Sequence, residues 1–406
     1  MEKSINLQKA QDIIINIPAN NSVENVPIQR ALNRVIAEDF AAIIPSPTFP
    51  RSAFDGYAFR SEDVKEASVK NPIVLKINQE IPAGCTAKCP VGPGEAAKIL
   101  TGAPIPEGAN AITKFEATEF DEEYVKIFEP IEDGLNIITI GEDIPEGTPL
   151  IPKGSVITPA MLGVMASQGL TEIGVIKKPK IAMVTVGSEL APLGAPLPPA
   201  MIYNSNMYAL QGYIEGLGAE FSGDVIVPDD HEVILDAINK AYDDGADMII
   251  TTGGASTGDY DCAYRTAEAS GGEILYWKLA IRPGGALLVY VLKGKLVLSL
   301  SGNPGAAAIG LLLLGLPYIR KLAGRNDLYP EEMTVKLKNS LTKDNPITRV
   351  IRGYLEIVDG EAYFVEEGKQ GGGDLSSLIN CNLIAEIPKG TPRLEAGSLV
   401  KAYKVE

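Results

Sequence analysis

The stretch IAMVTVGSEL (residues 181–190), together with MIITTGGASTGDYD (248–261) and LVLSLSGNPG (296–305), decides the fold class of this chain. Each begins with a run of apolar and hydroxyl residues and passes into a glycine-containing turn. Continuous runs of this kind are typical of strands that are buried on both faces of a parallel sheet. Helical spacing follows them, at about residues 206–217, 232–243 and 305–322. The alternation predicts an α/β domain with a mainly parallel sheet over residues 178–325.

The sequence outside this domain predicts three further parts. Residues 4–40 have helix-like spacing, and a helix is expected from about Pro159 to Ser167, with Thr158 as its N-cap. Short β-type runs between Gly and Pro turns fill residues 51–140 and again 326–406. We expect an N-terminal helical and linker domain (1–44 plus 141–177), an inserted β-rich domain (45–140), the α/β domain (178–325) and a C-terminal β domain (326–406).

Composition excludes several classes of function. The 406 residues carry 36 Lys and Arg against 52 Asp and Glu, a net charge of −16, which argues against a nucleic-acid or membrane-surface binder. With a single His, multi-His metal sites and His-dependent triads are excluded, and the four Cys lack the ligands of a zinc site. The low Cys count and the absence of a visible signal peptide predict a cytoplasmic protein. The apolar run 306–316 is too short to span a bilayer and predicts a buried helix.

Acidic residues follow the predicted strands. In open α/β sheets, ligands bind beyond the carboxyl ends of the strands. Glu189 follows the strand expected at 181–186, Asp229 and Asp230 follow a further short strand expected at Val225–Val227, and Asp259 and Asp261 follow the strand expected at 248–252. Each could equally be a helix N-cap or a solvated loop residue. Because hard oxygen ligands beside a phosphate pocket suit Mg²⁺, we take Glu189, Asp230 and Asp261 as candidate metal ligands.

Two glycine turns and two basic residues complete the predicted pocket. Glycine lets backbone N–H groups approach a phosphate, and a helix N-terminus attracts anions, although a glycine after a strand is often only a turn. Lys278 and Arg282 bracket a strand-like stretch, where they could pair with phosphate or with the carboxylates, or be solvated surface charges. The candidate substrate-binding residues of the two turns are Gly253, Gly254, Ser256, Ser301, Gly302 and Asn303.

Two loops of the β-rich part also carry candidate site residues. Asp55 lies in FPRSAFDGYAF (49–59) and Thr101 in ILTGAPIPEGANAI (99–112). Both loops are candidates for reaching over the pocket of another domain.

At this point the motifs resemble those of the MoeA and gephyrin E-domain family. The resemblance runs in order from about residue 7 to residue 404, and the set is far more specific than any one motif. It rests on FPRSAFDGYAF, ILTGAPIPEGANAI, GEDIPEG (141–147), VTVGSEL (184–190), TTGGASTGDYD (251–261), WKLAIRPG (277–284), LSGNPGAAA (300–308) and NCNLIAEIPKGTPRLEAGSLVKAY (380–403).

The resemblance implies a fold and a reaction. It implies an elongated homodimer of four-domain subunits with a MogA-like, three-layer α/β central domain, and a site between that domain and the β-rich domain of the second subunit. The reaction implied is that of a molybdopterin molybdenumtransferase, which consumes adenylated molybdopterin and molybdate, requires Mg²⁺ and releases AMP. A MogA-type adenylyltransferase and molybdoenzymes are further partners to expect. By motif position, the catalytic residues implied are Asp55, Asp143, Glu189, Asp230, Asp261, Lys278 and Arg282, with Thr101 in the cleft.

The chain also departs from the family pattern. Arg282 stands where the family commonly has Lys, Gly285 stands where it has a second Lys, and Ser301 replaces a Pro. Arg282 keeps the positive charge but not the point-donor geometry of Lys. Because Gly285 lacks a second positive group, and Asn136, Ile138 and Thr139 stand where basic residues are usual, the pocket should be less positive than in the family. Three alternatives stay open: a molybdopterin- or cofactor-binding paralogue with altered catalysis, a tungstate-preferring enzyme, and an adenylyltransferase that uses the central domain alone.

Overall fold

The computed structural model describes residues 2–191, 193–194, 196–254 and 262–405. Within it the chain forms two compact units. Unit 1 comprises residues 1–38, 153–162 and 172–406, and unit 2 comprises residues 39–152 and 163–171. The boundary falls inside helix α2 (Pro159–Ser167), whose bounds match the predicted helix. Each unit is described by itself below.

A seven-stranded sheet is the centre of unit 1. Its order is β1-β19-β21-β22-β18-β14-β17. The pairs β1–β19, β22–β18, β18–β14 and β14–β17 are parallel, whereas β21 is antiparallel to both of its neighbours, so the prediction of a mainly parallel sheet is confirmed. The strands are β1 (Glu2–Ile5), β14 (Lys180–Val186), β17 (Glu220–Val227), β18 (Met248–Thr252), β19 (Glu273–Leu279), β21 (Leu288–Leu292) and β22 (Lys295–Leu300).

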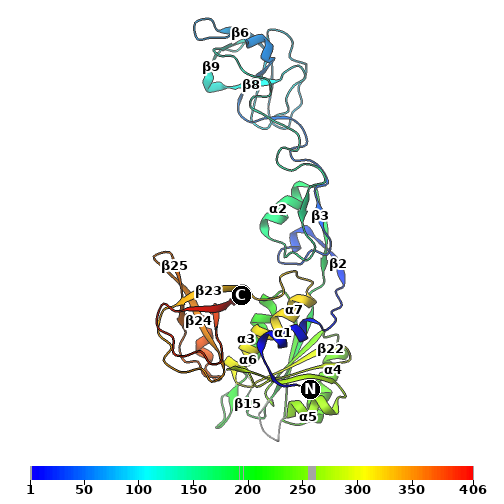
Figure 1. Ribbon diagram of the computed structural model, residues 1–406. Helices are drawn as coiled ribbons and strands as arrows, with labels where there is room; N and C mark the ends of the chain where they lie inside the picture. The colour runs from blue at the N-terminus through cyan, green and yellow to red at the C-terminus, as the bar shows by residue number, and fades with distance from the viewer. Residues whose placement is uncertain (1, 192, 195, 255–261, 406) are drawn as a thin grey trace. The chain divides into compact units, whose positions relative to one another are not determined.

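Helices cover both faces of this sheet, giving the three layers expected for an α/β domain. Figure 1 shows α1, α3, α6 and α7 on one side of β22, with α4 and α5 on the other. Strand β14 serves both layers, because Ile181 and Met183 join one apolar cluster while Val184 and Val186 join the other. The helices are α1 (Leu7–Ile15), α3 (Ser205–Gly216), α4 (His231–Asp243), α5 (Cys262–Ala269), α6 (Pro304–Gly310) and α7 (Leu316–Leu322).

The apolar helix of the sequence is confirmed as a core helix. Helix α6, the π-helical segment Leu311–Gly315 and α7 follow one another without a break. In the part of the chain that the structure describes, this is the one helix long and apolar enough to cross a membrane, and 94% of its apolar window is buried within the protein. This helix is apolar because it is buried in the layer between the central sheet and the helices that pack against it.

The N-terminal region is less helical than predicted. Strand β1 pairs with β19 of the central sheet, and α1 packs beside α7. The helix-like spacing of Leu32, Val35 and Ile36, with Pro27 near a helix start, predicted a second helix, and this prediction is wrong. Residues 23–27 form strand β2 (Val23–Pro27), and only a short 3₁₀ turn, Ile28–Arg30, follows it. Strand β2 pairs antiparallel with β13 (Glu172–Ile176), a partner distant in sequence that short-range spacing does not reveal.

The C-terminal part of unit 1 is a closed sheet, as its short runs predicted. The order is β20-β24-β25-β23-β27-β26, and β26 pairs back to β24, which leaves the five main strands with no free edge. Strand β20 comes from the central region and pairs with β24. The strands are β20 (Ile281–Arg282), β23 (Glu332–Leu337), β24 (Thr348–Val358), β25 (Glu361–Glu366), β26 (Leu383–Ile387) and β27 (Leu399–Lys404).

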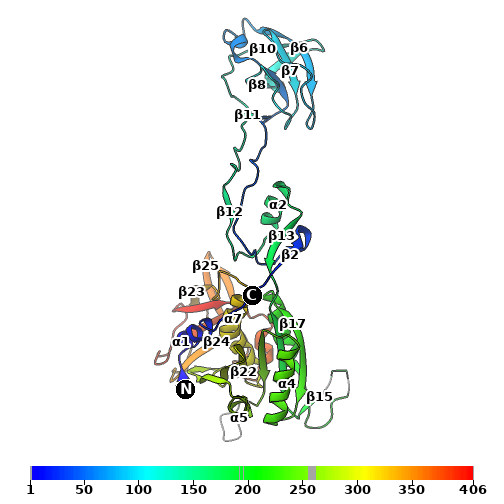
Figure 2. The same cartoon turned by 90° about the vertical axis from the view of Figure 1, so that its right-hand side faces the viewer.

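Unit 2 is β-rich, as predicted. Figure 2 shows β6, β7, β8 and β10 of its six-stranded sheet, whose order is β8-β5-β7-β6-β10-β9. Two short strand pairs, β11–β4 and β12–β3, lie outside that sheet. The strands are β3 (Phe40–Ala41), β4 (Arg51–Ser52), β5 (Gly56–Phe59), β6 (Ile73–Ile81), β7 (Glu95–Ile99), β8 (Ala111–Lys114), β9 (Thr118–Phe120), β10 (Tyr124–Ile127), β11 (Ile137–Ile138) and β12 (Pro149–Ile151).

Candidate functional site

A cavity of about 740 Å³ lies at the carboxyl ends of the central strands. We call it the site cavity. The ends of β14, β18 and β22 form its floor, and the N-terminal turns of α3 and α6 line its sides. The short pair β15 (Leu190–Ala191) and β16 (Ile202–Tyr203) contributes to its rim. The sequence predicted a ligand site at this edge of the sheet, and the site cavity lies there, beside both predicted glycine turns.

The two predicted glycine turns meet in the floor of the cavity. Gly253 has a φ of +87°, and a Cβ at this position would lie 2.1 Å from the carbonyl oxygen of Val186. Only glycine fits there without moving the end of β14. A Cβ on Gly302 would lie 3.4 Å from the Cα of Gly253, so the two turns are packed against each other. Gly254 and Ser301 also line the cavity, whereas Ser256 lies outside the described residues.

Helix α3 presents its N-terminus to the cavity. Asn204 is the N-cap, and its Oδ1 accepts a hydrogen bond from the backbone N–H of Met207 at 3.1 Å. Ser205 and Asn206, the first residues of the helix, line the cavity. Asn206 is buried and donates from Nδ2 to the carbonyl oxygen of Gly302 at 2.8 Å. This bond ties α3 to the SGNPG turn, so the positive end of one helix is held beside the start of another.

The second helix N-terminus belongs to α6. Asn303 is its N-cap and Pro304 its first residue, and the Asn303 side chain makes no capping hydrogen bond within the described chain. The N–H of Ala306 donates to the carbonyl oxygen of Gly372, which lies in a glycine-rich loop of the C-terminal part. Gly373 of the same loop lines the cavity. A domain far along the sequence therefore helps to close the site.

A buried arginine holds that glycine-rich loop. Arg352 on β24 is fully buried, and burial lowers the pKa of its guanidinium. Its Nε donates to the hydroxyl of Ser377 at 2.6 Å, and Nη2 donates to the carbonyl oxygen of Gly371 at 2.8 Å. A Cβ on Gly305 would lie 2.9 Å from Nη1, so the first turn of α6 packs directly on the guanidinium. Arg352 is a positioning residue that sequence reasoning missed, because nothing in its local pattern marks it as buried.

The structure separates the predicted carboxylates. Glu189 lines the cavity, as does Asp229. The side chain of Asp230 instead caps α4, where Oδ1 accepts from the backbone N–H of Glu232 at 2.9 Å. Asp261 lies outside the described residues, and within those residues no cluster of three or more His, Cys, Asp or Glu could hold a metal ion. Two carboxylates therefore line the described part of the cavity, Glu189 and Asp229. Glu189 was predicted from the sequence, whereas Asp229 is the neighbour of the predicted Asp230.

The two predicted cations lie outside the lining of the cavity. Lys278 is at the end of β19, and its Nζ lies 4.4 Å from the centre of the Trp277 ring. Arg282 is exposed on β20, which pairs with β24. A Cβ on Gly285 would lie 2.4 Å from the carbonyl oxygen of Ile281, so a side chain at this position needs a different backbone path. Among the described lining residues, the positive end of the electrostatic field therefore comes from backbone N–H groups and helix N-termini, and not from Lys or Arg side chains.

In unit 2 the structure brings two of the predicted residues together. Oδ1 of Asp55 accepts hydrogen bonds from the backbone N–H and from the hydroxyl of Thr101, each at 2.7 Å. The backbone bond, followed by the hydroxyl bond, lowers the pKa of the Asp55 carboxyl. Asp143 is exposed and follows β11, and its backbone N–H donates to the carbonyl oxygen of Ser46 at 3.1 Å.

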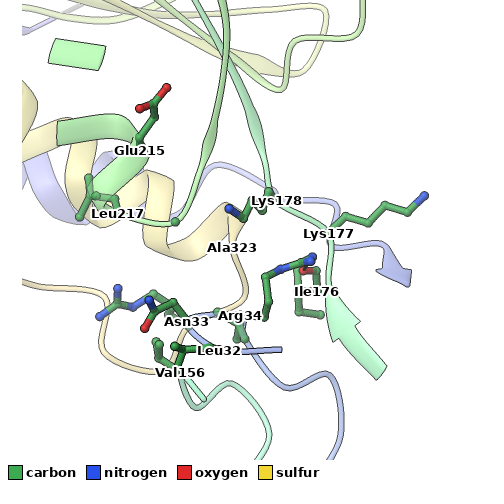
Figure 3. A pocket seen from close by; sticks show the side chains of 14 residues that line it. Leu32, Asn33, Arg34, Val156, Ile176, Lys177, Lys178, Glu215, Leu217 and Ala323 are labelled. Carbon is green, nitrogen blue, oxygen red and sulfur yellow. Dashed lines mark hydrogen bonds between the residues drawn. The ribbon is translucent and has the colours of Figure 1, made fainter. Parts of the chain in front are cut away.

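A second cavity, of about 420 Å³, lies at the other ends of the same helices. We call it the distal cavity. The C-terminal ends of α3 and α7 line it at Leu217 and Ala323, as Figure 3 shows. Lys177 and Lys178, which follow β13, belong to its lining. Arg34 and Arg325 lie there too, but they pair with Glu24 and Asp327. The two arginines are already paired and the helix carbonyl ends carry partial negative charge, so this cavity offers an anion less positive charge than its four cations suggest.

The carboxylates of the site cavity fit a magnesium ion that is shared with a phosphate-bearing substrate. Mg²⁺ in such sites is usually held by one or two carboxylates together with substrate phosphates and waters. Glu189 and Asp229 supply that number of acidic ligands, while the helix N-termini beside them suit the phosphates. The residues present are therefore compatible with Mg²⁺ without a third protein carboxylate.

Three family models match consecutive parts of the chain. They are described as the MoeA N-terminal region (domain I and II), over residues 5–169, a probable molybdopterin binding domain, over 182–321, and the MoeA C-terminal region (domain IV), over 334–405. The matched ranges cover the same segments on which the motif resemblance rests.

Relatives of known name match along nearly the whole length. A molybdopterin molybdenumtransferase of Staphylococcus aureus (strain COL) is 34% identical over 402 residues, which are 99% of this chain and 96% of the relative. One of Staphylococcus epidermidis (strain RP62A) is 32% identical over 382 residues, 94% and 91% of the two chains. The crystal structure of a molybdopterin biosynthesis MoeA protein from Pyrococcus horikoshii superposes with a TM-score of 0.85 at 30% identity and covers 99% of both chains.

Proposed function

The chain belongs to the MoeA family, and from this premise we propose that it is a molybdopterin molybdenumtransferase acting in molybdenum cofactor biosynthesis. The observation that carries the proposal is the site cavity, where two helix N-termini and two glycine turns face two carboxylates. Such a cavity suits a ligand with phosphate groups and a bound cation. We take the substrates to be adenylated molybdopterin and molybdate, and the products to be the molybdenum cofactor and AMP.

Positive and negative groups of the cavity bind different parts of the substrate complex. The N-terminal turns of α3 and α6, with the hydroxyls of Ser205 and Ser301, bind the phosphates. Glu189 and Asp229 would hold Mg²⁺, which when bound neutralises phosphate charge. Asp230 and Asp261 remain proposed contributors, as do Lys278 and Arg282. Catalysis of this kind consists of positioning and charge stabilisation by fixed groups.

We further propose that the working form is a homodimer in the cytoplasm. In that form, Asp55, Thr101 and Asp143 would act on the substrate bound by the second subunit. The Asp55–Thr101 pair supports this role, because an exposed carboxylate that is oriented by two hydrogen bonds is ready to meet a ligand. A MogA-type adenylyltransferase would supply the substrate and molybdoenzymes would accept the product.

Subunit complementation tests the shared site. Glu189→Gln and Asp55→Asn should each abolish turnover when purified alone. After mixing and exchange of subunits, the hybrid dimers should regain activity, because one of their two sites then carries both wild-type residues. Mixtures that stay inactive although exchange is demonstrated would contradict a site made by two subunits.

Direct assay tests the activity itself. The purified protein is incubated with adenylated molybdopterin, molybdate and Mg²⁺, and AMP is quantified. AMP release that depends on both molybdate and Mg²⁺ is the expected result. Chelation of Mg²⁺ should stop it.

A second candidate function is a molybdopterin-binding protein without transferase activity. One observation favours it: the lining of the cavity, as far as the described residues form it, carries no basic side chain, since Lys278 lies over Trp277 and position 285 is glycine. Binding of molybdopterin without AMP release at any molybdate concentration would support it. AMP release with tungstate but not with molybdate would instead indicate a tungstate-preferring enzyme, and formation of adenylated molybdopterin from ATP would indicate an adenylyltransferase.

A further inference from the structure

A buried polar network lies directly beneath the N-terminus of α3. Asp224, on the edge strand β17, accepts a hydrogen bond at Oδ1 from the hydroxyl of Thr185 at 2.8 Å. Its Oδ2 accepts from Nδ2 of Asn204 at 3.1 Å. The same Nδ2 also donates to Oγ1 of Thr185, at 3.3 Å. Thr185 and Asn204 are buried and both line the site cavity, so the network joins the edge strand to the floor of the site.

The carboxylate in this network has no positive partner. No Lys or Arg forms an ion pair with Asp224 in the described part of the chain, and its hydrogen-bond donors are neutral. Burial raises the pKa of Asp224, and the bonds from Thr185 and Asn204 only partly offset it. The half-buried carboxylate is held by the neutral donors of Thr185 and Asn204, and its hydrogen bonds therefore orient these two side chains.

The network leaves the Asn204 amide with one orientation. Both hydrogens of Nδ2 have acceptors, Asp224 and Thr185, so the amide cannot flip without losing them. Oδ1 is thereby directed at the first turn of α3, where it accepts from the N–H of Met207. The two acceptors of Nδ2 therefore hold the Asn204 side chain in its capping orientation. The capping hydrogen bond in turn sets the direction of the first turn of α3.

We propose that Asp224 is a positioning residue of the site cavity: through Asn204 it holds the N-terminal turn of α3 in the orientation that binds a phosphate group. The ligand's identity rests on the proposed function, but the positioning itself does not. Asp224 does not line the cavity, so it acts through Asn204 and Thr185 and not on the substrate. On its other side, the same turn is fixed by the bond from Asn206 to Gly302.

An exchange of the two side chains tests the proposal. Asp224→Asn replaces one acceptor oxygen with an NH₂ group, so one donor of the network loses its acceptor, and AMP should bind about tenfold more weakly. Asn204→Asp alone places two carboxylates in contact and should weaken AMP binding at least as much. The double variant restores one amide facing one carboxylate, so the α3 turn should regain its orientation. Because its carboxylate now lies at position 204 in the cavity lining, AMP affinity should recover only in part, to a value above that of either single variant.

The matched control is Glu220→Gln, which removes a carboxylate from the exposed start of the same strand, far along β17 from Asp224. Its AMP affinity should equal that of wild type. The KM for adenylated molybdopterin should rise in Asp224→Asn while kcat changes less, since the residue orients a binding group. Wild-type AMP affinity in Asp224→Asn, or no recovery in the double variant, would overturn the proposal.

Amide hydrogen exchange separates this inference from the proposed function. In the ligand-free protein, the N–H of Met207 should exchange faster in Asp224→Asn than in wild type, and the double variant should reverse the change. If the wild-type protein neither binds AMP nor releases it, the proposed function fails, yet this measurement still decides the role of Asp224. Unchanged exchange at Met207 in Asp224→Asn would reject that role whatever the enzyme does.

Discussion

The site cavity and the distal cavity lie at opposite ends of the same two helical segments. Helix α3 begins at Ser205 in the first and ends beside Leu217 in the second, and the segment Pro304–Leu322 does the same. The cavities share walls but differ in charge. Carboxylates and backbone N–H groups meet in the site cavity, whereas lysines and helix carbonyl ends meet in the distal one.

The difference shows that the direction of the two helical segments decides which cavity can bind an anion. The N-terminus of a helix carries about half a positive charge and its C-terminus about half a negative one. In a chain with a net charge of −16, an anionic substrate needs such fixed positive ends, because acidic side chains dominate elsewhere. In the distal cavity, Lys178 lies near the carbonyl end of α7 at Ala323, where a positive charge is favourable.

The largest expected effect comes from the floor of the site cavity. Gly253→Ala puts a methyl group 2.1 Å from a backbone oxygen at a positive φ, so the free energy of unfolding should fall by about 3 kcal/mol. Chemical denaturation measures the change. Gly212→Ala is the control, since its Cβ meets no atom within 4 Å inside α3, and it should be neutral or stabilising.

A new carboxylate at the N-terminus of α3 should separate binding from stability. Ser205→Asp suits the helix dipole but repels phosphate, so the free energy of unfolding should stay the same or rise while AMP binds roughly tenfold more weakly. Titration calorimetry and denaturation give the two values, with Ser205→Asn as the uncharged control. An unchanged AMP affinity would show that this helix end does not hold the phosphate.

Charge reversal in the distal cavity should give the opposite pattern. Lys178→Glu places a negative charge near two helix C-termini and should lower the free energy of unfolding by about 0.5–1 kcal/mol, less at high salt. AMP affinity should not change. If AMP binding weakened by tenfold instead, the assignment of the anion to one end of the helices would be wrong.

The smallest effect concerns the Asp55–Thr101 pair of unit 2. Thr101→Val removes the hydroxyl bond but keeps the backbone bond, so the pKa of Asp55 should rise part of the way towards its usual 3.8. Because the folded pKa lies below the unfolded value, the pair contributes stability above the unfolded pKa that is lost as pH falls through the folded pKa. Carbon-detected NMR titration of the Asp55 carboxyl measures the shift. A pKa that does not move would mean that the hydroxyl bond is not formed in solution.

Much of the central domain could be predicted from its strands and helices. Strand β18 begins and ends at the predicted residues, and β14 and β22 each begin one residue earlier than predicted. Parallel strands bring their carboxyl ends to one edge, so the glycine turns at 253 and 302 were placed together by topology alone.

Other features depend on contacts that spacing does not encode. Strand β2 looked helical because its partner, β13, is remote in sequence. Asp229 and Asp230 are neighbours with the same chemistry, and only the start of α4 decides which of them becomes the cap. The burial of Arg352, and the hydrogen bonds of Arg352 and of the half-buried Asp224, appear only once strands from distant segments are packed.

The pairing of β1 with β19 constrains the order of events during synthesis. Residues 2–5 are synthesised long before their partner strand, which ends only at Leu279. Strand β1 therefore cannot pair at the edge of the central sheet until after unit 2 has been synthesised. All strands of unit 2 have their partners within residues 40–151, so unit 2 can form its sheets earlier. Nascent chains stalled before residue 273 should resist protease in unit 2 while their first helix is still cleaved.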